Sequence, residues 1–567
     1  MIAGKIKTLI QKAGDSLGFE LPIVHLEHPD ILSHGDYATS VALAAAKSAG
    51  KAPKEIADLL KAEIEKSLPE EIEKVEVAGP GFLNFHLSRK FLADSIGEIV
   101  SNKDFGKGDA LSGKKALFEY TDPNPFKAFH IGHLMANAVG ETLSRIAENQ
   151  GADVKRLCYQ GDIGLHVAKA VWAMKQMKEK MPKDEDSFDA KVAFMGEAYV
   201  LGTNTYEDDP KVAEEIKEIN KKLFDRSDSK LQELYDKGRE WSLEYFDSIY
   251  KKLDTHFDGF IFESEVGPVG KEIVEKNIPN VFTESEGAVI FKGEDHGLHT
   301  RVFLNSQRLP TYEAKELGNT VEKEKRYDFD ISIVTSASEI TDYFKVVKCA
   351  YALINPEAAS KIGFIGHGML RFAEGKMSSR KGNIITGEGL LNDIAAIVAE
   401  KIKDRELSDK EKEEICNGVA VAAIKYSILR QSPGKDIIFD REKSLSFEGD
   451  SGPYLQYATV RAHSLIEKAK ASSVEANTTS VPADVATIEK LLYRFPEVAL
   501  RSWEEKAPQL LVEYLTSLAG AFNNFYAQGL IVSDASDSPY KVAITKAFGT
   551  VMERGLGLLG IPVLKKM

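Results

Sequence analysis

Residues 119–149 constrain the fold more than any other stretch of the chain, because they predict a strand, a tight turn and a helix in succession. The apolar run 116–121 indicates the strand, and the Pro-containing sequence DPNPFKAF indicates the turn. The helix is indicated by apolar residues at a spacing of three or four: Met135, Val139, Leu143 and Ile146. A second strand is predicted over 154–159. Strand, helix and strand in that order are typical of a parallel sheet.

The turn places the sequence His130, Ile131, Gly132, His133 at the amino end of this helix. Free backbone N–H groups and a partial positive charge at such an end favour an anionic ligand. The two imidazoles lie three residues apart on one face, and Gly132 lets a flat ring approach the backbone. The pattern predicts a site for a nucleoside triphosphate. A helix cap, or a metal pair that lacks further grouped ligands, would explain the same residues.

The chain has 567 residues, which is too long for one core, and it predicts three to five domains. A hydrophobic content of 43% with 28% charged residues is typical of globular proteins. No apolar run is long enough to cross a membrane, and the first residues read as an amphipathic helix rather than a signal peptide. We therefore expect a cytoplasmic protein with no membrane partner.

The three cysteines, Cys158, Cys349 and Cys416, lie far apart and form no C-x-x-C pattern. This spacing argues against disulfides and against a cysteine zinc site, so we expect no protein-bound zinc. The formal net charge is -14. Such a charge opposes nucleic-acid binding overall, although local basic patches can still hold phosphates on an acidic body.

Residues 1–108 predict a separate small α+β domain, which ends in a polar, glycine-rich linker. Its second predicted strand carries Phe82 and Asn84 on one face. An aromatic ring beside an amide suits one unpaired base, by stacking and by hydrogen bonding to its edge. A core phenylalanine beside an asparagine at a strand end is the alternative.

Alternating strands and helices over residues 109–390 predict the α/β domain that contains the paired histidines. A charged, helical insertion is expected within it, over about residues 178–300. The sequence GEDHGLH at 293–299 holds acidic and histidine residues that could bind a metal, but a polar turn between two short strands also explains it. Near the end of this domain, Lys376, Arg380 and Lys381 are expected in an exposed, mobile loop that could close over a triphosphate.

From residue 391 the pattern is almost wholly helical, with a connecting region over 391–445 and an all-α domain over 446–567. One helix begins at Pro508 and carries an apolar stripe that consists of Leu511, Leu515, Leu518, Phe522 and Phe525. Another begins with Tyr454, Tyr457 and Arg461. These side chains suit unstacked RNA bases, although packing between helices would also explain the tyrosines.

HIGH at 130–133 and KMSSR at 376–380 resemble the two signature motifs of class I aminoacyl-tRNA synthetases. Several longer stretches together resemble the arginyl-tRNA synthetase family: VAGPGFLNFHL, FEYTDPNPFKAFHIGH, GDIGLHVAK, LPTYEAKELG, GKMSSRKGN, GDSGPYLQYATVRAHS and GLGLLGIPVLKKM. The likeness runs nearly end to end. It implies an α/β Rossmann-like catalytic domain with a parallel sheet, an α+β N-terminal domain and an all-α anticodon-binding domain.

The resemblance implies that ATP, carried with Mg2+, activates L-arginine as an adenylate, and that the arginyl group then passes to the 3'-terminal adenosine of tRNA(Arg). In both transfers the protein mainly has to align the reacting groups and stabilise the charge that develops on them. The implied catalytic residues are His130, His133, Lys376 and Arg380. The implied ATP-binding residues are His130, Gly132, His133, His367, Gly368, Met369, Lys376, Met377 and Ser378.

A guanidinium group offers forked donors that carboxylates accept in pairs. By resemblance, arginine would be held by Glu119, Asn124, His130, Tyr312 and Glu316. Phe82 and Asn84 would meet the tRNA elbow, and Tyr454 and Tyr457 the anticodon loop. The resemblance further implies that activation needs bound tRNA. We expect a monomer.

The chain departs from the family pattern at two positions. Ser379 stands where class I enzymes usually have the second loop lysine, so Arg380 or Lys381 would supply that charge. Glu316 stands where the acid that binds the guanidinium group is usually an aspartate. The rival interpretations are another H-x-G-H nucleotidyltransferase that acts on a small molecule, and a synthetase-like protein that binds RNA without catalysis. A cysteinyl-type zinc synthetase is disfavoured by the scattered cysteines.

Overall fold

A five-stranded parallel sheet forms the centre of the computed structural model, which describes residues 2–373 and 386–567. Its strand order is β11-β10-β4-β5-β6, and every neighbouring pair is parallel. The strands are β4 (Lys115–Tyr120), β5 (Asp153–Gln160), β6 (Gly259–Phe262), β10 (Ile331–Ala337) and β11 (Ile362–His367). The predicted parallel α/β sheet is therefore confirmed.

The strand order changes direction at β4. The chain moves from β4 to β5 and β6 on one side, and later places β10 and β11 on the other side. In open parallel sheets, ligands bind at the carboxyl ends of the strands where the order reverses. The crevice between β4 and β10 is therefore the expected place for a ligand, and helix α5 (Ile131–Asn149) begins there.

Helix α5 is buried on almost every side. It packs against β4, β5 and β10, while α15 (Asp409–Leu429), α19 (Phe495–Glu504), α20 (Pro508–Ala527) and α21 (Ser538–Leu558) cover it from the C-terminal region. Leu134, Leu143 and Ile146 are fully enclosed in the main hydrophobic core. Because this core is shared, the position of α5 depends on the sheet and on the C-terminal helices together.

The expected helical insertion over 178–300 is only partly correct. Helices α7 (Phe188–Asp208), α8 (Pro210–Asp225) and α9 (Ser229–Lys252) pack with α6 (Leu165–Gln176) around a core of their own. Beyond them, β6 returns to the main sheet. Helix α10 (Glu263–Lys276) follows, and then an antiparallel sheet of β7 (Thr283–Ser285), β8 (Ala288–Phe291) and β9 (Arg301–Leu304). Its strands have only three or four residues each, which is too few to show a periodic pattern in the sequence.

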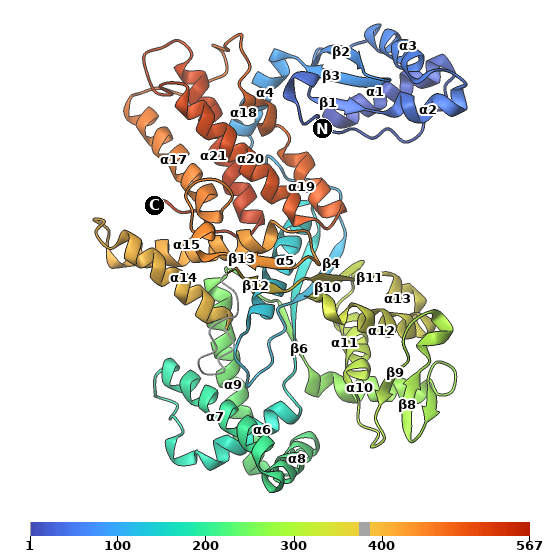
Figure 1. The fold of residues 1–567 in the computed structure, drawn as a ribbon, viewed down its shortest axis with the longest axis vertical. Coiled ribbons are helices and arrows are strands. Elements are labelled where there is room, and N and C mark those ends of the chain that lie inside the picture. The colour runs from blue at the N-terminus through green and yellow to red at the C-terminus, as the bar shows by residue number, and fades with distance from the viewer. Residues whose placement is uncertain (1, 374–385) are drawn as a thin grey trace.

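The N-terminal region is an α+β unit, as predicted. An antiparallel sheet of β1 (Tyr37–Thr39), β3 (Phe82–Leu87) and β2 (Ile72–Ala78) is covered by α1 (Ile2–Leu17), α2 (Val41–Ala49) and α3 (Pro53–Glu65). Helix α4 (Arg89–Ser101) leads out of this unit and packs on α18 (Thr487–Leu492) and α21. Figure 1 shows this unit at one end of the molecule, against the C-terminal helices.

The C-terminal region is helical, also as predicted. It contains α14 (Gly387–Ile402), α15, the short strand β13 (Ile437–Phe439), α16 (Arg441–Ser444) and α17 (Gly452–Ala471), followed by α18 to α21. Strand β13 pairs with β12 (Leu370–Phe372). The predicted apolar stripe of α20 is confirmed, because Leu511, Leu515, Leu518 and Phe522 are fully buried.

Two glycines allow α10 and α11 (Tyr312–Arg326) to cross in close contact. A Cβ atom on Gly318 would lie 2.2 Å from the carbonyl oxygen of Val266, and one on Gly270 would lie 1.8 Å from that of Ala314. These obstacles are backbone atoms, so an added methyl group would force the helices apart. Helix α12 (Thr341–Ile354) and α13 (Pro356–Ser360) complete this side of the sheet.

We expect Gly318→Ala to lower the free energy of unfolding by about 1–3 kcal/mol, because it overpacks this crossing. Urea denaturation would measure the loss. Gly196→Ala in α7 is the matched control, since its Cβ would meet no atom within 4 Å. That control should leave stability unchanged or raise it by up to about 1 kcal/mol. Equal stability of the two variants would contradict the close crossing.

Candidate active site

The two histidines of the H-x-G-H sequence stand together at the start of α5. His130 is the N-cap residue and His133 lies in the first turn. Their rings stack with centroids 3.5 Å apart, and the backbone N–H of His130 donates to Nδ1 of His133 at 3.2 Å. Because Nδ1 of His133 accepts this bond, the ring proton is placed on Nε2. His133 can therefore donate one hydrogen bond from Nε2 to a ligand.

Both imidazoles are held in the neutral form. Burial places the pKa of His133 well below its usual value, and repulsion from His130, when that ring is protonated, and from Lys127 lowers it further. The pKa of the exposed His130 is also lowered, first by loss of hydration beside its neighbours and then by Lys127 and His367. Each ring therefore offers one N–H donor near pH 7 rather than two. Lys127, which is not among the predicted site residues, is the nearby cation that acts on both.

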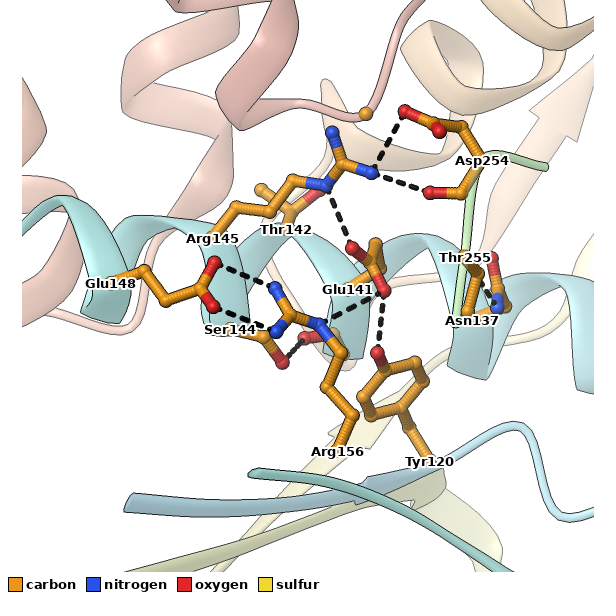
Figure 2. Close-up of polar contacts among 12 residues, drawn as sticks. Tyr120, Asn137, Glu141, Thr142, Ser144, Arg145, Glu148, Arg156, Asp254 and Thr255 are labelled. Carbon is orange, nitrogen blue, oxygen red and sulfur yellow. Dashed lines mark hydrogen bonds and ion pairs between the residues drawn. The ribbon is translucent and has the colours of Figure 1, made fainter. Parts of the chain in front are cut away.

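A buried network of charges holds α5 in place (Figure 2). Glu141, in the middle of the helix, is 1% exposed and accepts from Arg145 at 2.7 Å and from the hydroxyl group of Tyr120 on β4. Arg145 also donates to the carbonyl oxygen of Gly557 at 3.0 Å and pairs with Asp254 at 3.0 Å. These contacts join the histidine-bearing helix to the sheet, to the end of α9 and to the end of α21.

Arg156 on β5 completes this network. Its guanidinium group donates two parallel bonds of 2.8 Å to Glu148, and its Nε lies 3.5 Å from Glu141. Nearer the amino end of the helix, Asn137 donates to the hydroxyl groups of Thr121 and Thr255 at 3.1 Å and 3.2 Å. The first half, the middle and the last turn of α5 are thus fixed to neighbouring elements by polar bonds of Asn137, Glu141 and Glu148 (Figure 2).

The turn between β4 and α5 has an unusual backbone. Thr121, Asp122 and Phe126 adopt positive φ values of 81°, 47° and 68°. Such values are costly for these residues, so the surrounding bonds must impose them. Asp122 accepts from the backbone N–H of Tyr159 at 2.8 Å, and Asn124 accepts from that of Gly161 at 3.0 Å. The turn is thereby fastened to the end of β5.

The predicted adenosine seat lies at the end of β11. His367 is buried with a lowered pKa, and its charge would act on both histidines of the pair, which shows that the three rings are near one another. Met369 follows and is 47% exposed, while a Cβ on Gly368 would lie 2.2 Å from the carbonyl oxygen of Lys435. The structure therefore brings His367 to the histidine pair.

The predicted basic loop lies outside the described residues. This applies to Lys376, Met377, Ser378, Arg380 and Lys381. The described chain ends on one side at Ala373, whose N–H donates to Phe439, and resumes at Thr386. Thr386 forms a β-bridge with His130, and the N–H of Gly387 donates to Phe129 at 2.7 Å.

The predicted guanidinium acids come together in one buried cluster. Glu119 on β4 and Glu316 on α11 are 2% and 6% exposed. Asn319 donates to Glu119 at 3.0 Å and to Glu316 at 3.4 Å, and the ammonium group of Lys323 lies 3.1 Å from Glu119. Burial, followed by the charge of Glu119, raises the pKa of Glu316 to about 7.

The cluster can accept a further cation. Lys323 is the counter-ion of the cluster, and the two carboxylates raise its pKa although burial alone would lower it. Both bonds to Glu119 end on Oε2, and the buried Oδ1 atom of Asn319 has no hydrogen-bond partner among the described residues. The cluster therefore has acceptor atoms without donors and more carboxylates than cations. Such a group of residues favours a cationic ligand that carries several N–H donors.

The rim of this cluster includes residues that the motifs did not reveal. Glu263, at the start of α10, pairs with the buried Lys315 at 2.7 Å. The hydroxyl group of Tyr343 donates to the carbonyl oxygen of Tyr312, whose side chain is 70% exposed. Tyr159 on β5 is partly buried, and the charges of Glu263, Glu316 and Glu119 add to the rise in its pKa that burial causes. These rim residues come from separate elements, so no local spacing in the sequence connects them.

Within the described ranges 2–373 and 386–567, no group of three or more histidine, cysteine, aspartate or glutamate side chains is arranged to hold a metal ion. Within 293–299, between β8 and β9, the chain forms the short 3-10 helix η3 (Gly293–His296). Across the same ranges, no helix combines the length and the apolar character needed to cross a membrane.

Three family models match consecutive parts of the chain. The model "tRNA synthetases class I (R), catalytic domain" matches residues 95–441, which is more than half of the chain. The chain belongs to the arginyl-tRNA synthetase family. The model "Arginyl tRNA synthetase N terminal domain" matches residues 2–87, and "DALR anticodon binding domain" matches residues 455–567. The resemblance seen in the sequence motifs is therefore confirmed.

Relatives of similar length support this membership. The arginine–tRNA ligase of Clostridium botulinum is 30% identical over 556 residues, covering 96% of each chain. That of Fusobacterium nucleatum is 31% identical over 548 residues, covering 94% of this chain and 93% of its own. The solved arginyl-tRNA synthetase of Thermus thermophilus shares the fold, with a TM-score of 0.82, 24% identity and complete coverage of both chains.

In the N-terminal domain of this family member, Phe82 and Asn84 lie on the face of β3 opposite to the core residues Leu83 and Phe85. Phe82 is half-buried and Asn84 is 7% exposed. The core alternative for Phe82 is therefore wrong, because its strand position directs it away from the packed helices.

Tyr454 and Tyr457 open α17, at the beginning of the DALR match, and line a cavity of about 590 Å³. The cavity also contains Arg405, Phe447, Glu448, Gly449, Arg461, Asn523 and Met567. Asn523 donates to the hydroxyl group of Tyr454 at 2.9 Å, and Arg461 donates to that of Tyr457 at 2.9 Å. Both tyrosines contact residues of the helical domain and also line a polar cavity. Packing between helices and exposure to a ligand, the two explanations that the sequence left open, therefore do not exclude each other.

Replacing Arg156 tests the buried network under α5. Arg156→Met leaves Glu141 with fewer partners, and we expect a loss of about 3–5 kcal/mol in the free energy of unfolding. The matched control is Lys155→Met on the same strand, whose ion pair with Asp258 is half exposed. That control should change stability little. Urea denaturation compares the variants, and equal losses would show that the network does not fix the helix.

Proposed function

We propose that the chain ligates L-arginine to tRNA(Arg) in two steps. The arginine carboxylate attacks the α-phosphorus of ATP and pyrophosphate leaves, and the 3'-terminal adenosine of the tRNA then accepts the arginyl group. The observation that carries the proposal is that one chain holds both the buried acid cluster of Glu119 and Glu316 and a pair of neutral histidines at a helix start. An acid cluster selects the amino acid, and donors at a helix start suit the triphosphate.

In the first step His130 and His133 act as hydrogen-bond donors to phosphate oxygens. Their neutral rings each offer one N–H group, so they stabilise charge on the phosphates without supplying a proton. Gly132 and the backbone from His367 to Met369 hold the adenosine. Mg2+ arrives with ATP and neutralises the phosphates, and it needs no dedicated protein site.

Lys376 and Arg380 supply positive charge from the other side of the triphosphate. Support comes from the described flanks, because the segment resumes at Thr386 in a bridge with His130. Nine residues lie between Lys376 and Thr386, and the ten chain steps span at most roughly 35 Å. The anchor therefore sets an upper limit on how far Lys376 can lie from His130. Arg380 or Lys381 would replace the lysine that Ser379 displaces.

The guanidinium group of arginine binds between Glu119 and Glu316. Lysine has a single ammonium group and cannot bridge two carboxylates in the same plane. Asn124 and Tyr312 hold the opposite end of the amino acid, and His130 lies between it and ATP. Lys323 supplies the positive charge that partly compensates the two carboxylates of the cluster.

Two regions away from the sheet bind the tRNA. Phe82 and Asn84, in the domain over residues 1–108, meet the elbow, and Tyr454 and Tyr457, in the domain over 446–567, meet the anticodon loop. The domain over 109–390 carries out the chemistry, and 391–445 connects it to the last domain. The protein acts as a monomer in the cytoplasm, where tRNA is charged for translation, because one chain provides all of these regions.

The experiment that tests the function is ATP–pyrophosphate exchange with arginine, lysine or glutamate, each with and without tRNA(Arg). We expect exchange with arginine alone among the three, and expect tRNA to be required. Exchange with another of these amino acids, or charging of no tRNA by arginine, would overturn the proposal.

The raised pKa of Glu316 predicts that arginine binding depends on pH. Below pH 7 its carboxyl group is mostly protonated and attracts the guanidinium cation weakly, whereas above pH 7 it is ionised. The dissociation constant for arginine should therefore fall about tenfold from pH 6 to pH 8, measured by calorimetry with tRNA present. Glu316→Gln should remove this dependence.

Glu322→Gln is the control for this measurement. Glu322 lies on the same helix and pairs with Arg326 at 2.7 Å, outside the cluster. It should keep the pH dependence of the unmodified protein. A slope that persists in Glu316→Gln would assign the titration to another group.

A further inference from the structure

Lys425, on α15, is a buried cation that the proposed reaction does not use. It is 1% exposed, and its Nζ atom donates to the carbonyl oxygens of Leu253 and Gly560, at 2.8 Å each. Taking an ammonium group out of water is costly, and two carbonyl groups compensate it less than a carboxylate would. The chain therefore keeps this lysine in a position where its charge is unfavourable.

Both carbonyl groups lie at the carboxyl end of a helix. Leu253 is the C-cap residue of α9, and Gly560 follows Leu559, the C-cap residue of α21. The last carbonyl groups of a helix lack partners within it and carry a partial negative charge. Gly560 has a φ of 61°, and a Cβ atom there would lie 2.6 Å from Nζ of Lys425. Lys425 thus fastens the ends of α9 and α21 to α15.

Arg145 of α5 reaches the same two helix ends. It donates to the carbonyl oxygen of Gly557 in α21 at 3.0 Å. It also binds both the carbonyl oxygen and the carboxylate of Asp254, which directly follows the cap of α9 (Figure 2). We refer to Lys425, Arg145 and the carbonyl groups that they bind as the helix junction. Two cations from α15 and α5 therefore hold the ends of α9 and α21 at one place.

The helix junction joins two parts of the chain that match different family models. Helices α5 and α15 lie within residues 95–441, which match the catalytic-domain model, whereas the end of α21 lies within residues 455–567, which match the anticodon-binding model. Both α15 and α21 also pack on α5. A movement of α21 would therefore act on α5, whose amino end carries His130 and His133.

We propose that Lys425 is a positioning residue that couples the domain over 446–567 to the histidine pair, through Arg145 and α5. The inference rests on the proposed function, in which tRNA is bound before arginine is activated. Binding of tRNA to that domain fixes the position of α21, and the helix junction passes this position on to α5. Lys425 is enclosed and touches no substrate, so it acts on the rate of adenylate formation and not on the affinity for ATP.

The charge of Lys425 makes this coupling depend on pH. Burial and then the charge of Arg145 lower the pKa of Lys425 to about 8, although Glu141 and Asp254 oppose the shift. As the pH rises through this value the ammonium group loses a proton, and bonds from the neutral amine are roughly half as strong.

The same titration affects folding with the opposite sign. The folded protein binds the proton of Lys425 more weakly than the unfolded chain does, because burial lowers the pKa. The fold therefore becomes more stable as the pH rises through about 8. A loss of activity over this range is thus not explained by unfolding at Lys425.

The test compares the unmodified protein with Lys425→Met in arginine-dependent ATP–pyrophosphate exchange, with saturating tRNA(Arg), at pH 7 and pH 9. We expect the kcat of the unmodified protein to exceed that of the variant about tenfold at pH 7 and about twofold at pH 9. The lysine is charged at the first pH and mostly neutral at the second. The ratio of the two kcat values cancels titrations that both proteins share, including that of the arginine amino group. The KM for ATP and the dissociation constant for tRNA, measured by fluorescence anisotropy, should be unchanged.

Lys425→Arg is a second variant, and it does not depend on the folding of Lys425→Met. Its guanidinium group stays charged at both pH values. The kcat of the unmodified protein relative to Lys425→Arg should therefore fall about fivefold from pH 7 to pH 9.

Lys506→Met is the matched control. Lys506 also has a pKa that burial lowers to about 8, and it donates at 2.7 Å to the carbonyl oxygen of Trp503, in the last turn of α19. It lies outside the helix junction, so its removal should leave kcat unchanged at both pH values. Urea denaturation of all the proteins at both pH values checks that each is folded in the assay.

A kcat ratio for Lys425→Met that stays constant with pH would overturn the inference, because it would show a packing role alone. A weakened complex with tRNA, or an equal effect of Lys506→Met, would also overturn it. In each of these cases the unmodified protein still exchanges with arginine, so the proposed function stands. Absence of arginine-dependent exchange by the unmodified protein would overturn both.

Discussion

The buried carboxylate of Glu141 is the interaction on which the rest of the structure depends. It lies in the middle of α5 and is neutralised by Arg145 and Arg156, from the helix and from β5. A buried charge is stable only where its partners are in place, so α5 can occupy one position relative to the sheet. Through Arg145 the same carboxylate is joined to the ends of α9 and α21. The histidine pair is therefore positioned by three regions of the chain.

The candidate active site combines two electrostatic environments. The histidine pair is neutral and donates, whereas the cluster of Glu119 and Glu316 is acidic. They suit a triphosphate and a guanidinium group respectively. The two environments come from different elements, because the histidines stand at the start of α5 whereas Glu119 lies on β4 and Glu316 on α11.

Features that depend on neighbouring residues could be predicted from the sequence. The start of α5 at His130, the parallel sheet and the buried stripe of α20 followed from local periodicity and turn chemistry. Residues brought together from distant elements could not be predicted in this way. Lys323 pairs with Glu119 across 204 positions of sequence, and the short strands after Lys252 lack a helical or alternating period long enough to detect. The assignment of Arg380 stays a prediction, since that residue is outside the described chain.

The most direct test of the central claim is a crystal structure of the protein with tRNA(Arg) and a non-hydrolysable analogue of arginyl-adenylate. The account predicts that the guanidinium group contacts Glu119 and Glu316, and that the bridging phosphate analogue lies within hydrogen-bond distance of His130 or His133. It also predicts that Lys376 reaches the same bridging group. A guanidinium group outside the acid cluster, or a phosphate analogue remote from both histidines, would contradict it.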